Sequence, residues 1–495
     1  GPNREAIEIA LQFAELVGAN VIEEMHFMRK VVVDGSNTSG FQRTALVATG
    51  GEIKYGNKTI EIEQICLEED SCRHGENKDE YLLDRLGIPL LEITTKPQLK
   101  EPKQVQMAAK ALGRLLRACR VKRGLGTIRQ DVNISIDGGE RVELKGFQDL
   151  STMTKVVENE IRRQQNLKDL SGTKASEPIE VTKHISKNRG TAIACKLTGW
   201  KKKLGTKKSP EGHIRMGREL ADYAKKAGVQ GLMHSDELPA YGISNEETKK
   251  IHQLLKCKDK DAFILIFGKK NVAEDAIGRV IERIKVKGVP KEVRRVTPDG
   301  LTRFLRPMPG ASRMYPETDI PPMKLTNIKV KTPKTLDQRE NEMPLNDEES
   351  KQIVSRNLDY KFRNFMEYYE EPKTISRLLL HTLPNLKTKN EKIIKEEAIT
   401  KVLKLVKEGK IAKEGIEDAL IQANSGKDIK IRNENIEEEV VKFVDKLINE
   451  KNDFIKQRGM ESIGPLMGPV MSKFRGEMDG AKINALLIKK IKEKM

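Results

Sequence analysis

The sequence predicts an α+β protein of several domains, in which a sheet-based part is interrupted by an α/β unit and followed by helices. Alternating and β-branched runs dominate the first part of the chain up to about Lys145. From about Val181, one strand-like run and several helical patterns form a unit of ordinary domain size that looks inserted. Beyond Met343, charged helical patterns continue to the end of the chain. At 495 residues the chain is too long for one core of ordinary size, which also favours several domains.

The charge balance predicts a polyanionic partner. Lys and Arg outnumber Asp and Glu by 91 to 73, which gives a formal charge of +18 and a pI near 9.4. Nucleic acid is the first candidate partner and an anionic membrane surface is the second. A highly charged, heat-resistant surface is the alternative explanation, because 33% of the residues are charged.

The cysteines and the hydropathy favour a soluble cytoplasmic protein. The five cysteines are scattered and form no CxxC pair, which is typical of a reducing compartment. No apolar run approaches the roughly 18 residues that a membrane-spanning helix needs, and no signal peptide is visible.

Acidic residues recur inside apolar segments between Cys66 and Lys145. The segments are CLEEDSCR, GIPLLEITT, TIRQDVNISI and RVELKG, and each looks like a short strand that carries a carboxylate. Burying an ionised carboxylate without a partner costs several kcal/mol or more, so such a series calls for a cation. Glu69, Glu92 and Asp131 lie in separate segments that could converge, and carboxylate oxygens are ligands that Mg²⁺ prefers. No zinc, Ser-His-Asp or Rossmann pattern competes with this interpretation.

The alternation assigns these acids to faces. A bulge near Gln64 would place Glu69 on the face of Ile65 and Leu67, and Glu68 on the other face. In the next strand, Glu92 shares a face with its neighbours at 90 and 94.

A second pair of alternating runs predicts a hairpin around Asp137-Gly138-Gly139. In this register Val132 faces Leu144 on one side, while Asp131 faces Lys145 and Asn133 faces Glu143 on the other. The second side is polar and would lie beside the acidic strands. A plain solvent-facing side explains the same pattern equally well.

The loop from Asp34 to Gly40, DGSNTSG, could cradle a phosphate. Its glycines and hydroxyls suit backbone N–H contacts with an anion, although it lacks the GK[ST] ending of a P-loop. The candidate cofactor-binding residues are Ser36, Asn37, Thr38, Ser39 and Gly40. An ordinary surface loop is at least as good an explanation of the spacing.

Several of these segments resemble one known family. HFMRKVVVDGSNTSGFQRT (His26 to Thr44), CLEED, PLLEI, RQDVNIS, VELK and MYPETDIPP resemble motifs of the synthetase-type component of tRNA-dependent amidotransferases, the GatB/GatE family. The DGSNTSGFQRT loop and an insertion at about 183–297 point to the archaeal GatE group. The insertion contains GLMHSDELPAYGIS (Gly231 to Ser244) and is similar to the insertion domain of bacterial-type aspartyl-tRNA synthetases. The match spans nearly the whole chain.

The resemblance implies a domain order. A β-sheet-based, kinase-like cradle domain would occupy residues 1–182 and 298–345, and an aspartyl-tRNA-synthetase-like α/β domain would occupy residues 183–297. An α-helical domain would follow at 346–430, and a helical tail at 431–495 would contact tRNA.

The resemblance also implies a ligase reaction. ATP would phosphorylate the γ-carboxylate of glutamate esterified to tRNA(Gln), and ammonia would then displace phosphate to give Gln-tRNA(Gln). The implied cofactors are ATP and Mg²⁺. The implied partners are GatD, an asparaginase-like glutaminase, in a heterodimer or heterotetramer, and tRNA(Gln) carrying Glu, with no role for a membrane or DNA. A non-catalytic tRNA-binding adaptor and an aminoacyl-tRNA synthetase relative stay open as alternatives.

Site residues follow from the matched motif positions. By resemblance, Glu69 and Glu92 are the acids of the Mg²⁺ site, and Glu69 also lies where ammonia arrives. Lys30 matches a lysine that lines the ammonia route, and Asp131 matches an aspartate of the active-site strand. The remaining matched positions are Arg129, Glu143 and Lys145.

Two departures from the family pattern bear on this expectation. GatB proteins carry a second lysine nine residues after the first, and that position is Ser39 here, so the ammonia route is expected to be gated differently. Family members also have a preceding segment with a histidine metal ligand, which is not present before Gly1. If that segment is absent, the active site is expected to be incomplete.

Overall fold

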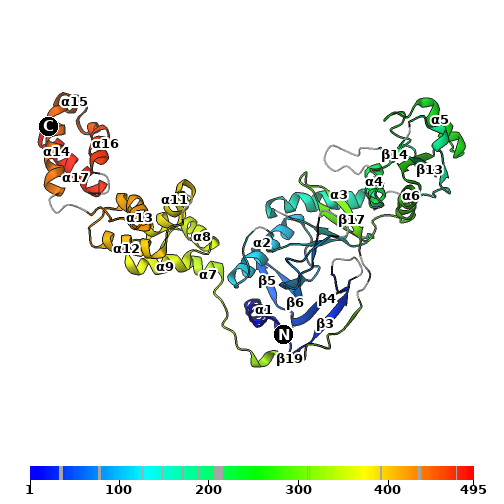
Figure 1. The fold of residues 1–495 in the computed structure, drawn as a ribbon, viewed down its shortest axis with the longest axis horizontal. Coiled ribbons are helices and arrows are strands. Elements are labelled where there is room, and N and C mark those ends of the chain that lie inside the picture. The colour runs from blue at the N-terminus through cyan, green and yellow to red at the C-terminus, as the bar shows by residue number, and fades with distance from the viewer. Residues whose placement is uncertain are drawn as a thin grey trace. The chain divides into compact units, whose positions relative to one another are not determined.

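The computed structural model describes residues 1–32, 37–75, 80–124, 126–147, 149–168, 172–187, 189–205, 216–308, 310, 313–390, 393–431, 436–474 and 477–494. The chain divides into two compact units, Gly1–Pro333 and Lys334–Met495 (Figure 1). The first unit mixes sheets and helices, and the second is helical in its described part, which confirms the predicted α+β class. The predicted cradle boundary at residue 345 falls inside the second unit. No helix among the described residues has both the length and the apolarity that crossing a bilayer would require.

The N-terminal sheet has the strand order β18-β3-β4-β6-β5, with β1 added to β4 and β9 added to β6. Its strands are β1 (Asn20–Val21), β3 (Phe27–Val31), β4 (Phe41–Thr49), β5 (Glu52–Tyr55), β6 (Lys58–Glu69), β9 (Pro89–Thr95) and β18 (Met314–Pro316). The register between β6 and β9 shifts between Ile62 and Gln64, which confirms the bulge that the alternation predicts. Short pairs flank this sheet: β2 (Glu24–Met25) with β19 (Met323–Lys324), and β7 (Arg73–His74) with β8 (Tyr81–Leu82).

The second sheet, here called the polar-faced sheet, has the order β10-β11-β16-β17. Its strands are β10 (Val132–Ile134), β11 (Val142–Lys145), β16 (Glu292–Val296) and β17 (Thr302–Pro307). Val132 pairs with Leu144 and Asn133 pairs with Glu143, so the predicted hairpin register is correct. β11 and β16 are parallel neighbours although the whole inserted segment separates them in sequence.

The inserted segment contains the third sheet, in the order β12-β13-β15-β14. Its strands are β12 (Ile179–Glu180), β13 (Thr191–Leu197), β14 (Met233–His234) and β15 (Ala262–Gly268). α4 (Met216–Lys225) and α6 (Lys270–Lys285) pack on the face of Cys195 and Ile264, and α5 (Asn245–Leu254) packs on the face of Ala194 and Phe263. Ser244 caps α5 in a capping box with Glu247.

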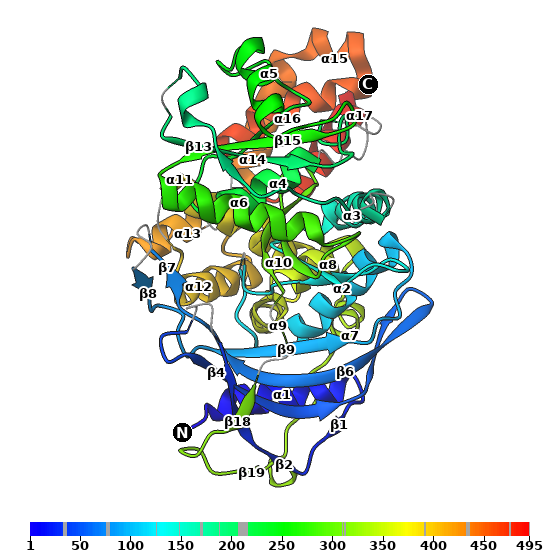
Figure 2. The ribbon, with the colours of Figure 1, turned by 90° about the vertical axis from the view of Figure 1, so that its right-hand side faces the viewer.

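The other helices of the first unit are α1 (Arg4–Leu16), α2 (Pro102–Ala118) and α3 (Met153–Lys168). Asn3 caps α1, since its side chain accepts the Ala6 N–H, and Pro102 starts α2 at a position where no helical N–H donor is needed. α2 and α3 pack together, and α2 contributes Ala108 and Leu116 to the core of the N-terminal sheet and Ala109 to the core of the polar-faced sheet. Figure 2 shows α2 between α3 and the N-terminal sheet.

A buried ion cluster ties the inserted segment to the polar-faced sheet. Arg294 of β16 is fully buried and donates to Glu219 of α4 at 2.9 Å and to Glu292 at 2.6 Å. Arg163 of α3 donates two hydrogen bonds of 2.9 Å to Glu160. The hydrophobic core around this cluster is also continuous, since Leu144 and Val156 belong to the same core as Leu220 and Val280. The inserted segment is therefore packed firmly onto the first unit.

The second unit consists of two helical groups with separate cores. The first contains α7 (Leu336–Asn341), α8 (Asp347–Ser355), α9 (Asp359–Tyr368), α10 (Pro372–Arg377), α11 (Leu383–Asn390), α12 (Glu396–Lys407) and α13 (Ile416–Asn424). The second contains α14 (Ile436–Glu450), α15 (Asn452–Arg458), α16 (Ile463–Lys473) and α17 (Gly480–Lys494). Asn357 adopts a φ of 57° and separates α8 from α9, so the charged helical pattern of this region is divided between two helices.

A buried carboxylate fastens β18 to the edge of the N-terminal sheet. Arg29 and Arg43 lie directly opposite each other on β3 and β4, an arrangement that is unfavourable for two like charges. The fully buried side chain of Glu317 accepts hydrogen bonds of 2.8 Å from Nε of both arginines. The hydrogen bond from Arg29 contributes most to lowering the pKa of Glu317 to about 2, and the hydrogen bond from Arg43 adds to this effect.

We expect Glu317→Gln to lower the melting temperature at neutral pH, because two opposed guanidinium groups would lose their carboxylate. The folded-state pKa of Glu317 is depressed, so its contribution is present above the ordinary Glu pKa of about 4.5 and is lost as the pH falls toward 2. Melting curves of both proteins between pH 7 and pH 2.5 should therefore converge. Glu8→Gln, which removes an exposed partner of Arg4, serves as the control and should show no such convergence. A constant difference at all pH values would contradict this explanation.

Candidate functional site

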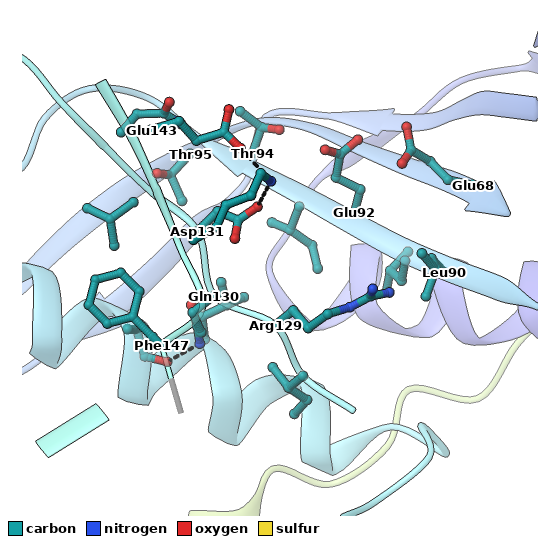
Figure 3. A pocket seen from close by; sticks show the side chains of 18 of the residues that line it. Glu68, Leu90, Glu92, Thr94, Thr95, Arg129, Gln130, Asp131, Glu143 and Phe147 are labelled. Atoms are coloured by element: carbon teal, nitrogen blue, oxygen red, sulfur yellow. Dashed lines mark hydrogen bonds and ion pairs between the residues drawn. The ribbon is translucent and has the colours of Figure 1, made fainter. Parts of the chain in front are cut away.

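A cavity of about 2900 Å³ lies in the first unit between the N-terminal sheet and the polar-faced sheet. β9, the loop that precedes it and the adjoining part of β6 supply one wall. The hairpin of β10 and β11 and the segment before it supply the opposite wall (Figure 3). The floor comes from α2. The acidic strands and the polar hairpin face that the sequence singles out therefore meet across one space.

Glu68 and Glu92 form an acidic pair on the first wall. Glu92 pairs with Cys66 across β6 and β9, so that Glu68, two residues further along β6, lies on the same face of the sheet as Glu92. Lys30 of β3 donates to Glu68 at 2.8 Å. Desolvation within the cavity, followed by the negative charge of Glu68, raises the pKa of Glu92 to about 7. An acid held so far from its usual range is a mark of a functional site.

Glu69 lies on the other face of the same strand. Its carboxylate accepts the backbone N–H of Arg43 at 3.0 Å and lies 3.5 Å from the Arg43 guanidinium. Glu69 does not line the cavity, whereas Glu68 does. This placement agrees with the faces that alternation predicts, and it differs from the pairing of Glu69 with Glu92 that the resemblance implies.

The opposite wall holds two carboxylates around one ammonium. Lys145 Nζ lies 2.5 Å from both Asp131 and Glu143. Burial opposes the charge of Lys145, but Asp131 and Glu143 outweigh it and raise the pKa of Lys145. Arg129 extends along the cavity toward Leu90 in Figure 3 and donates to Asp70 at 3.2 Å. The structure thus places Lys30, Glu92, Arg129, Asp131, Glu143 and Lys145 on the walls of one cavity.

The predicted phosphate loop lies partly outside the described residues, and Ser36 belongs to the part that is not described. Asn37 lines the cavity. The Gly40 N–H already donates to the Asn37 carbonyl at 2.9 Å, and the Ser39 hydroxyl donates to Phe41 O at 3.0 Å. These groups close a turn, with Gly40 at a φ of 73° and Thr38 between them. The role of Asn37, Thr38, Ser39 and Gly40 in cofactor binding stays a prediction.

The acidic pair fits a hard divalent cation. Two carboxylates that share one face, one of them with a raised pKa, would be relieved of mutual repulsion by Mg²⁺. Mg²⁺ sites usually combine one or two carboxylates with phosphate oxygens and water, so a pair is a sufficient protein contribution. Within the described ranges, no group of three or more His, Cys, Asp and Glu side chains is arranged to hold a metal ion.

Sequence reasoning missed two features of this part of the molecule. Gln42 lies opposite Lys30 on β4 and donates to Glu69 O at 2.8 Å, beside the Glu68 carboxylate. The pairing register of β3 and β4 would have indicated the position of Gln42. That register cannot be deduced from the sequence, because the length and path of the loop between the two strands are not known from it. The pairing of Asp70 with Arg129 joins residues far apart in the chain, and no local pattern indicates it.

Comparison with known proteins shows the family to which this chain belongs. Residues 1–331 match the model of the GatB/GatE catalytic domain, and residues 361–491 match that of the GatB domain. The chain belongs to the GatB/GatE family.

Among its relatives, three archaeal GatE proteins, described as glutamyl-tRNA(Gln) amidotransferase subunits, are particularly similar. The protein from Archaeoglobus fulgidus is 41% identical, with 99% of this chain and 84% of that protein covered. Those from Methanococcus maripaludis and Thermococcus sibiricus are 40% and 38% identical, each with 99% of this chain and 85% of the relative covered. The resemblance seen in the motifs is thereby confirmed.

Proposed function

We propose that this chain is the synthetase component of a tRNA-dependent amidotransferase, which converts Glu-tRNA(Gln) to Gln-tRNA(Gln). The γ-carboxylate of the esterified glutamate attacks the γ-phosphorus of ATP, and ADP leaves. Ammonia then attacks the acyl phosphate, and phosphate leaves with loss of a proton from nitrogen. The observation that carries this proposal is the cavity in which the Glu68–Glu92 pair faces Lys145 and Arg129. The family membership and the names of the relatives agree with it.

The acidic and basic residues of the cavity have different roles in the proposed reaction. Glu68 and Glu92 would hold Mg²⁺, which supplies positive charge to the phosphates when bound. Lys145, held between Asp131 and Glu143, presents a fixed ammonium toward the cavity. Arg129 presents a guanidinium that is 47% exposed and suited to phosphate oxygens. Phosphoryl transfer needs little beyond positioning and such charge neutralisation.

Ammonia would reach the acyl phosphate along the face of Lys30, Gln42 and Glu68. These side chains form a hydrogen-bonded polar line from β3 across β4 to β6, because Lys30 and Gln42 both contact the Glu68 carboxylate. A glutaminase partner of the GatD kind would supply the ammonia. Ser39 stands where GatB proteins carry a second lysine. Its hydroxyl donates to the backbone and does not join this line, so Lys30 is the lysine that takes part in it.

The test is an amidation assay with the full chain, Glu-tRNA(Gln), ATP and Mg²⁺. The ammonia source is either the partner glutaminase with glutamine or an ammonium salt. We expect ATP-dependent formation of Gln-tRNA(Gln) from both sources. Binding of Glu-tRNA(Gln) without any amide formation, with the partner present, would instead favour a non-catalytic adaptor.

Removing residues 431–495 should raise the KM for tRNA, since this helical tail, which ends in the lysine-rich helix α17, is proposed to contact the RNA. The tail has its own core, so the truncation removes a complete helical group. Several lysines of α17 are already paired with α14, including Lys490 with Asp445 at 2.9 Å, so we expect a rise of about tenfold or less. Initial rates at varied tRNA and at varied ATP measure the effect, and KM for ATP is the internal control. An unchanged KM for tRNA would reject the tail as an RNA contact.

A further inference from the structure

A row of cations crosses the polar-faced sheet, starting at the cavity. Lys145, which lines the cavity, pairs directly with Arg295 on the neighbouring strand β16. Arg295 in turn pairs directly with Arg303 on β17. Directly paired residues point to the same face of a sheet, and neighbouring strands lie about 4.8 Å apart. The row therefore leads from the cavity toward the inserted segment.

Helix α4 of the inserted segment adds further cations at the end of this row. α4 packs beside β17 (Figure 1), and Asp222 on α4 accepts from Arg303 at 2.9 Å. Lys226 directly follows α4 and lies close enough to Arg295 that partial desolvation, followed by this second positive charge, lowers the pKa of Lys226. Both side chains are exposed. We call the set Arg218, Lys225, Lys226, Arg295 and Arg303 the basic seam.

The basic seam contains too little negative charge to neutralise itself. Its five cations have two acids near them. Asp222 is buried, is bonded to Arg303 and lies near Arg218, Lys225 and Lys226 as well, and Asp299 lies near Arg218. Over the described part of the chain, no ion pair involves Lys226 or Arg295. On α6 of the inserted segment, by contrast, two cations have acidic partners on the same helix: Arg279 with Asp275 at 3.0 Å and Lys285 with Glu282 at 2.7 Å. Lys226 and Arg295 are exposed like charges that lie near each other, and such a pair is stabilised when an anion binds between them.

The geometry points to the phosphates of the tRNA acceptor end as the ligand of the basic seam. This inference rests on the proposed function, which places the aminoacyl ester in the cavity. The nucleotides that carry the ester must leave the cavity, and the basic seam starts one strand from Lys145. Arg295 and Lys226 do not line the cavity, so they lie beyond the position where ATP must meet the substrate carboxylate. A positively charged path that follows the backbone is how proteins hold single-stranded nucleic acid ends.

The test compares the full chain with Lys226→Gln/Arg295→Gln in binding uncharged tRNA(Gln) transcript. We expect the affinity of the double variant for the transcript to be about tenfold weaker. The slope of log K against log salt concentration should also be shallower, by an amount that corresponds to the loss of about one to two phosphate contacts. Lys249→Gln/Lys250→Gln is the matched control, because these exposed lysines lie on α5, across the third sheet from α4. The control should bind as the unchanged chain does. The melting temperature of the seam variant should not fall, since removing crowded like charges costs no stability.

Two further measurements place the contact. A transcript that lacks its last four nucleotides should bind the seam variant and the unchanged chain equally, whereas a persisting difference would overturn the placement at the acceptor end. KM for ATP should stay the same, and a rise would assign the seam to the nucleotide instead. Wild-type affinity and salt slope for the double variant would overturn the inference outright. Binding needs neither ATP nor amidation, so the result is independent of whether the proposed reaction occurs.

Discussion

Replacing Glu68 with Gln is expected to lower the rate of amide formation about 100-fold, while tRNA binding stays unchanged. The substitution removes a negative charge from the acidic pair that faces the cavity and removes the ion pair with Lys30. Glu92→Gln should have an effect of similar size, because either carboxylate alone leaves the proposed cation site incomplete. Single-turnover rates with ATP, Mg²⁺ and saturating Glu-tRNA(Gln) measure the loss, and a filter-binding Kd for tRNA checks the binding.

Glu69→Gln is the matched control, since it makes the same chemical change one residue further along β6. Glu69 contacts Arg43 on the far face of the sheet, so we expect a smaller loss than for Glu68→Gln. If Glu69→Gln loses activity at least about tenfold and Glu68→Gln does not, the acid implied by the family motif is correct and the role given to the cavity face is wrong.

Replacing Arg294 with Met should lower the free energy of unfolding of the first unit by about 3–5 kcal/mol. The change would leave the Glu219, Glu292 and Glu160 carboxylates buried with too little positive charge around them. Trp200 is the single tryptophan of the chain and is buried in the core that surrounds this cluster, so its fluorescence during chemical denaturation reports on this region.

Arg279→Met provides the control for this measurement. Arg279 pairs with Asp275 at a position where both side chains are about half exposed, so its loss should cost at most about 1 kcal/mol. Adding Glu219→Gln to Arg294→Met should recover part of the stability, because one uncompensated buried charge is then removed. Equal stability of Arg294→Met and the unchanged chain would show that the cluster does not secure the inserted segment.

Local patterns in the sequence predict much of what builds the cavity walls. Alternation predicts the β6 bulge and the register of the β10–β11 hairpin, because a side-chain period of two fixes which residues share a face once one face is apolar. The pairing of Asp131 with Lys145 follows from that register. The motifs in turn predict the family. These features depend on residues close together in the chain, which is why they are visible without the fold.

The sequence by itself determined the class of the protein, the acidic strands and the polar hairpin face. Only the tertiary structure decided that Glu68, rather than Glu69, meets Glu92 in the cavity, because this depends on which face of the N-terminal sheet turns toward the polar-faced sheet. It also decided that Arg294 is balanced by Glu219 and that Arg295 lies near Lys226. Each of these pairs joins the strand after the insertion to helix α4 or the residue that follows it, and no local periodicity encodes such a contact.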